Sequence, residues 1–126
     1  MRVASGLVLV IVLLAPEALA DDSISGLWKE TSTPGHKSSF VVFSQDGEQV
    51  VASCYWEHEG RSIVWHGIGT RKGRRIAYRV THTRYPQGWV RLGEHRLTLS
   101  EDGKTMTGRW TNSRQESGLL VFVRKK

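Results

Sequence analysis

The chain has 126 residues, 24% of them charged, with a formal net charge of +6 and a single cysteine. One cysteine excludes a domain held together by disulfides within one chain, so packing and backbone hydrogen bonds must stabilise the fold. The positive charge favours anionic partners such as polysaccharide, lipid head groups or nucleic acid, although it is equally compatible with a role in solubility alone.

Residues 1–20 have the features of a signal peptide. Arg2 precedes a nearly unbroken apolar run, Val3 to Ala15, and Ala18-Leu19-Ala20 supplies small residues at the cleavage position. The run is shorter than the ~20 residues that span a bilayer. We therefore predict cleavage after Ala20, with an uncleaved membrane anchor as the alternative. The mature chain, residues 21–126, is then a single secreted or periplasmic domain with no membrane span.

The mature chain consists of short runs of alternating apolar and polar residues, and none has the periodicity of an amphipathic helix. Glycine-containing turns separate these runs about every 11–14 residues, the spacing of an all-β barrel or sandwich. The first strand begins near Gly26, and further strands are predicted at residues 37–44, 49–58, 62–70, 75–83, 89–100, 105–112 and 118–125. Asp46-Gly47 and Asp102-Gly103 provide the positive φ that tight hairpin turns need.

The alternation assigns one dry face to each strand. In the strand at 75–83 this face carries Ile76, Tyr78, Val80 and His82, and in the strand at 49–58 it carries Val50, Ala52, Cys54 and Trp56. A four-residue loop at 101–104 predicts two cross-strand pairs, Leu99 with Met106 and Leu97 with Gly108, on the same face as Trp110. Such patterning is typical of an antiparallel sheet with one buried side.

The predicted fold class is all-β, a single antiparallel up-and-down barrel of about eight strands. Sequentially connected short strands close most simply in this way, since closure removes exposed sheet edges. A ninth strand and a two-sheet sandwich remain open at this point, because both share the same pattern of strands and turns.

Gly26-x-Trp28 on the first strand of a short exported all-β chain resembles the calycin superfamily, which includes the lipocalins and avidins. The resemblance implies that Trp28 closes one end of the barrel and that a basic side chain from the last strand lies over it. Arg124 occupies the matching place. The residues by which avidins contact biotin have no counterpart that can be matched one by one, so the resemblance carries over no specific ligand.

No group of residues predicts catalysis, and no catalytic residue, metal ion or cofactor is assigned. An enzyme stays open as a third hypothesis, which turnover abolished by a His or Glu substitution would support. The five histidines lack the spacing of a metal site on one strand or helix. The chain contains neither a nucleophile elbow nor a phosphate-binding glycine loop. Cys54 is expected to be a small buried apolar residue, with an intermolecular disulfide as the alternative.

The candidate ligand-binding residues are large aromatic and polar side chains on the central strands. They are Trp56, Trp65, Tyr78, His82 and Trp89. Two interpretations remain open, because a barrel of eight strands has room either for packed side chains or for one small ligand. In the first, these rings fill the core. In the second, they line a cavity for a small, partly apolar ligand, with residues 84–89 as a loop at its rim.

A third feature is a group of basic residues, Arg71, Arg75 and Arg79, expected on the outer face. This face predicts an alternative function, the binding of an acidic polysaccharide, an envelope component or another protein, for instance as an inhibitor. Export makes nucleic acid an unexpected partner. The oligomeric state is left open.

Overall fold

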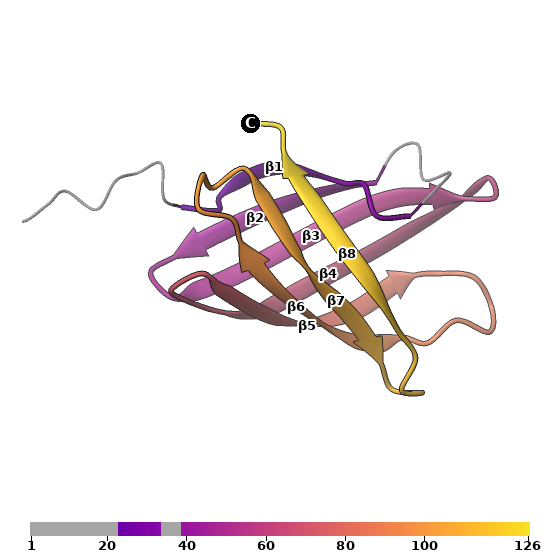
Figure 1. Ribbon diagram of the computed structural model, residues 1–126. Helices are drawn as coiled ribbons and strands as arrows, with labels where there is room; N and C mark the ends of the chain where they lie inside the picture. Colours follow the sequence, from indigo (N-terminus) through magenta and orange to yellow (C-terminus); the bar gives the residue numbers. More distant parts are fainter. Residues whose placement is uncertain (1–22, 34–38) are drawn as a thin grey trace, which may run out of the picture.

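Eight antiparallel strands form one closed barrel in the computed structural model, which describes residues 23–33 and 39–126 (Figure 1). The strands are β1 (Gly26–Glu30), β2 (Phe40–Asp46), β3 (Gln49–His58), β4 (Arg61–Lys72), β5 (Arg75–Arg84), β6 (Leu92–Leu99), β7 (Thr105–Asn112) and β8 (Ser117–Arg124). The proposed signal peptide, residues 1–20, lies outside the described residues. Within the described part, no helix is long and apolar enough to cross a membrane.

The pairing of β1 with both β2 and β8 closes the sheet on itself. The predicted up-and-down barrel is therefore confirmed, and the two-sheet sandwich is excluded. Consecutive strands run in opposite directions, so the turns after β2, β4 and β6 gather at one end of the barrel (Figure 1). The loops after β3, β5 and β7 gather at the other end. We call these the closed end and the open end, for the reasons given below.

Every second side chain of a strand points into the barrel, as β3 shows with its buried residues Val50, Ala52 and Cys54. The register between β6 and β7 pairs Leu97 with Gly108 and Leu99 with Met106, which confirms the predicted four-residue loop. The strand predicted at 89–100 begins later, at Leu92, because the preceding residues belong to the loop after β5.

The glycine of Gly26-x-Trp28 is required by the way the chain termini cross. Gly26 has a φ of +137°, and a Cβ at this position would overlap the carbonyl oxygen of Lys126. The two segments are also joined by a hydrogen bond of 3.0 Å from the amide of Leu27 to the same oxygen. Only glycine allows β1 to begin this close to the end of the chain.

Trp28 and Arg124 seal the closed end. Trp28 is fully buried, and its indole Nε1 donates a hydrogen bond of 2.9 Å to the carbonyl of Ile24. The guanidinium carbon of Arg124 lies 4.5 Å from the centre of the indole ring, the placement that the calycin resemblance implied. Arg124 also donates hydrogen bonds to the carbonyls of Gly103, at 3.0 Å, and Ser23, at 2.8 Å. One side chain thus joins β8, the turn after β6 and the segment that precedes β1.

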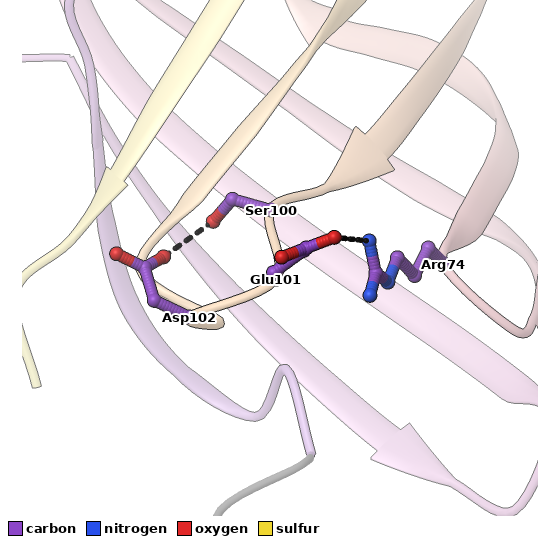
Figure 2. A network of polar contacts seen from close by, with 4 residues as sticks. All are labelled: Arg74, Ser100, Glu101 and Asp102. Carbon is purple, nitrogen blue, oxygen red and sulfur yellow. Dashed lines mark hydrogen bonds and ion pairs between the residues drawn. The ribbon is translucent and has the colours of Figure 1, made fainter.

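The turn after β6 is held by its own side chains (Figure 2). The hydroxyl of Ser100 donates to the Asp102 carboxylate at 2.7 Å, and the amide of Lys104 donates to the same oxygen at 3.0 Å. These hydrogen bonds, the Ser100 one foremost, lower the pKa of Asp102. Arg74, from the turn after β4, contacts Glu101 at 3.4 Å in an ion pair on the surface.

The expectation that Arg71 belongs to a basic outer face is wrong, because this residue is buried. Its side chain is 8% exposed and points into the barrel at the closed end, where it donates to Gln45 at 3.1 Å and to the carbonyl of Gly73 at 2.8 Å. The physical reason is the two-residue period of β4, which places Arg71 on the same side as the buried Trp65 and Gly67. Arg71 therefore belongs to the interior, whereas Arg75 and Arg79 are exposed.

We expect Arg124→Leu to lower the free energy of unfolding by about 2–4 kcal/mol, because it removes a cation–π contact and charged hydrogen bonds. Arg74→Leu is the matched control at the same end of the barrel. Its ion pair is exposed, so a change within about 0.5 kcal/mol is expected. Urea unfolding of both variants measures the difference, and equal losses would contradict the closing role of Arg124.

Candidate functional site

The open half of the barrel contains a cavity of about 460 Å³. Toward the closed end, the rings of Trp28, Phe43 and Phe122 pack edge to face with centres 5.9–6.1 Å apart. Phe122 is the one of the three that also lines the cavity. The volume lies in the range of pockets that hold small organic ligands. Of the two interpretations of the aromatic residues, core filling describes the closed half, and a cavity occupies the open half.

Four of the five predicted ligand-binding residues line this cavity. They are Trp56, Trp65, His82 and Trp89. They come from β3, β4, β5 and the loop after β5, so closure of the barrel brings together residues that are distant in sequence. Trp110, on β7, adds another indole to the wall, and Leu120 and Phe122 of β8 contribute apolar surface. The wall therefore contains the indoles of Trp56, Trp65, Trp89 and Trp110 and the ring of Phe122.

Trp89 lies at the mouth of the cavity, in the loop between β5 and β6 that projects from the open end (Figure 1). Its ring centre lies 5.6 Å from that of Trp56, 5.4 Å from that of His58 and 6.4 Å from that of His82. The loop is tied to the turn after β7, because Arg114 donates a hydrogen bond of 3.0 Å to the carbonyl of Gly88. The predicted rim loop is thus part of an aromatic mouth.

His82 is half-buried beside this mouth. Its Nδ1 lies 3.2 Å from the carbonyl oxygen of Arg91, and its amide donates to the same oxygen at 2.8 Å. Burial lowers the pKa of His82, and the hydrogen bond to Arg91 opposes that shift in part. The backbone bonds orient the imidazole so that it forms part of the cavity wall.

Tyr78 is the predicted residue that does not line the cavity. It shares a face with His82 as expected, but it is 2% exposed and lies deeper, packed against Trp65 with ring centres 6.0 Å apart and planes 18° apart. Its hydroxyl oxygen lies 2.8 Å from Nδ1 of His95. Burial raises the pKa of Tyr78 well above its ordinary value, so the phenol remains protonated. Alternation predicted the side of the strand correctly, but it carries no information on depth.

His95 is the residue that the sequence analysis missed. It points inward from β6 and lines the cavity, with its ring centre 5.0 Å from that of Trp65 and 5.0 Å from that of Tyr78. The signal was present, because His95 alternates with Leu97 and Leu99 and stands opposite Trp110 in the register. Burial lowers the pKa of His95 to about 3.

Trp110 has room in the wall because its neighbour on β8 is a glycine. A Cβ on Gly118 would overlap the indole Nε1 of Trp110. The two residues are paired in the register of β7 and β8. Glycine therefore allows the indole to lie against the backbone of the next strand and leaves the adjoining volume open.

The polar side of the cavity is formed by Glu30, Ser39 and Cys54. Glu30 accepts hydrogen bonds from the amide of Ser32 at 3.1 Å and the hydroxyl of Thr33 at 3.2 Å, and also from the Ser32 hydroxyl. Burial raises the pKa of Cys54 to about 12, with Ser39 opposing and Glu30 adding to the shift. The thiol is therefore protonated at neutral pH and a poor nucleophile.

The outer face of β5 carries the remaining residues of the predicted basic group, Arg75 and Arg79. Arg79 stands opposite Glu94 in the register, and Glu94 forms an ion pair of 2.8 Å with Arg96. Glu94 is thus an acidic neighbour of Arg79 on this face, and the next pair outward, Arg96 and Arg109, is basic.

In the part of the chain that the structure describes, no group of three or more His, Cys, Asp or Glu side chains is arranged to hold a metal ion. A comparison of the sequence with known protein-family models found no match, and a comparison with curated proteins found no relative. Candidate roles for the cavity therefore depend on its geometry and chemistry.

The low pKa of His95 predicts acid destabilisation. Its pKa is about 3 in the folded protein against an ordinary value of 6.5, so between these pH values the unfolded chain binds more protons. Stability should therefore fall as the pH drops below about 6.5, by up to about 1.4 kcal/mol per pH unit from this residue. Urea unfolding of wild type and His95→Gln from pH 7 to 4 isolates the contribution, because other groups titrate in both. Parallel stability curves would contradict the prediction.

Proposed function

We propose that this protein is an exported binding protein that holds a small, partly apolar ligand in the barrel cavity and catalyses no reaction. The observation that carries the proposal is the aromatic cavity of about 460 Å³ at the open end of a barrel whose other end is sealed. Such an arrangement agrees with the calycin resemblance, which implies a barrel that is sealed at one end and admits a ligand at the other.

The physical basis of binding is apolar contact with a preformed wall. The indoles of Trp56, Trp65 and Trp110 offer large rigid surfaces, and burying apolar area against them stabilises a complex by roughly 25 cal/mol per Å² before ordering costs. Those costs are small here, because backbone ladders on both sides of each strand already hold the side chains in place. The polar groups at the rim would then orient the ligand.

The chemistry of the cavity supports binding without turnover. The Cys54 thiol is held protonated by burial, and His95 is held neutral well below physiological pH. A nucleophile or a general acid–base pair needs a pKa near the working pH. The pKa of Cys54 is raised and that of His95 is lowered, so both values lie far from neutral pH. Both side chains are therefore suited to hydrogen bonding and packing and not to acid–base or nucleophilic catalysis.

Export is the part of the proposal that rests on residues 1–20, whose sequence is typical of a cleaved signal peptide. Outside the cytoplasm, a closed barrel has the advantage that it exposes no sheet edge to other chains. We propose that the protein sequesters or carries its ligand in a secreted or periplasmic location. Native mass spectrometry of protein purified from its source would reveal the ligand as a reproducible added mass.

Adjacent leucines on β8 offer a matched test of the cavity. Leu120 is 6% exposed and lines the cavity, whereas Leu119 is 54% exposed on the outer face. With the neutral fluorophore N-phenyl-1-naphthylamine as probe, we expect Leu120→Trp to weaken binding at least tenfold, because the indole occupies the cavity. Leu119→Trp should retain the wild-type affinity, and both should depend little on salt. Equal effects of the two substitutions, or a steep salt dependence, would assign binding to the outer surface.

A further inference from the structure

His95 is a polar ring in an apolar setting. It is 9% exposed, and its neighbours are Trp65, Tyr78 and Phe122, the last with its ring centre 6.5 Å away. A polar group in such surroundings costs free energy unless its nitrogens are hydrogen-bonded. Nδ1 is satisfied by Tyr78 at 2.8 Å. The state of the other nitrogen, Nε2, then decides what this wall of the cavity can bind.

The Tyr78 hydroxyl determines which imidazole nitrogen carries the proton. Among the described residues, this hydroxyl has His95 as its hydrogen-bond partner and no second acceptor. The phenol therefore donates its hydrogen to Nδ1, since the reverse assignment would leave a buried O–H without an acceptor. A neutral imidazole carries one hydrogen, so Nε2 is the donor. Tyr78 is held in this position by Gly67, where any Cβ would overlap the phenol ring.

Nε2 faces the cavity. It has no hydrogen-bond partner among residues 23–33 and 39–126. In the same part of the chain, no fully enclosed side-chain nitrogen or oxygen lacks a partner. Nε2 therefore reaches accessible surface, and the accessible surface beside His95 is that of the cavity. The deep wall presents a single oriented N–H donor.

The surroundings select the charge of the group that accepts this hydrogen bond. His95 stays neutral because burial holds its pKa at about 3. Three charged side chains line the cavity. Glu30 and Glu116 are acidic and repel an anion, and the basic Arg114 lies on the turn after β7 with its guanidinium bonded to the carbonyl of Gly88. An anionic acceptor beside His95 would be desolvated without a neighbouring cation. A carbonyl oxygen is uncharged and accepts one N–H with good geometry.

From these observations we infer that the protein recognises an uncharged aromatic or other apolar ring compound that bears a carbonyl group. The carbonyl oxygen accepts the Nε2–H of His95, and the rings lie against the indoles of Trp65 and Trp110. The inference rests on the proposed function and adds the chemical class of the ligand. His95 is the residue that determines specificity, and Tyr78 positions it by fixing the tautomer.

The test compares two neutral probes of similar length, flavone, which carries a ring ketone, and 2-phenylnaphthalene, which carries no acceptor. Quenching of tryptophan fluorescence measures the affinity of the full mature protein for each. We expect wild type to bind flavone about tenfold more tightly, the gain of one buried hydrogen bond. This preference needs no variant and tests the donor directly.

The variants assign the preference to His95. His95→Phe keeps a ring but removes the donor, and it should bind the two probes equally. His66→Phe, an exposed histidine on the outer face of β4, should keep the tenfold preference. Tyr78→Phe frees Nδ1 and should reduce the preference, because the tautomer is no longer held. Circular dichroism verifies the fold of each variant.

The failures are distinguishable. If wild type binds both probes equally, or if His95→Phe retains the preference, the carbonyl inference is overturned while the cavity remains the binding site. If neither probe binds and Leu120→Trp has no effect on N-phenyl-1-naphthylamine, the proposed function fails with it.

Discussion

Closure of the sheet between β1 and β8 is the constraint on which the rest of the structure depends. This seam is short, and its ladder within the described residues consists of Trp28–Arg124, Lys29–Val123 and Glu30–Phe122. Arg124 reinforces it from the side, over the Trp28 indole and against two carbonyls from other segments. With the seam closed, the strands of the described part leave no sheet edge exposed, and the core toward the closed end is shielded from water. Without it, neither the core nor the cavity would have a complete wall.

The interior is divided along the barrel axis into a filled half and a hollow half. At the closed end, short turns bring the strands together over Trp28, Phe43 and their apolar neighbours, which interlock edge to face. At the open end the walls are indoles and imidazoles, and Gly118 allows one indole to lie flat against β8. The same fold thus supplies rigidity at one end and a preformed cavity at the other, which keeps the ordering cost of binding low.

Some of the charged residues have structural roles at the closed end of the barrel. Arg71 and Arg124 are structural groups of the closed end, and their hydrogen bonds satisfy carbonyls that the turns leave unpaired. On the outside, Glu94 and Glu101 accompany the arginines. The Tyr78–His95 pair, which we propose as the determinant of specificity, lies inside the barrel, where a hydrogen bond is stronger than in water.

The sequence by itself determined the all-β class with about eight strands, the dry face of the strands at 49–58 and 75–83, and the register at the turn after β6. These features follow from a two-residue period and from turn residues, both of which are local. The contact of Arg124 with Trp28 was implied by the calycin resemblance. Only the tertiary structure decided that Arg71 lies inside, that Tyr78 lies below the cavity and that His95 lines it. Alternation tells which side of a strand a residue faces but not its depth along the barrel axis. Depth depends on strand tilt and on the register of all eight strands at once, a property that no single segment contains.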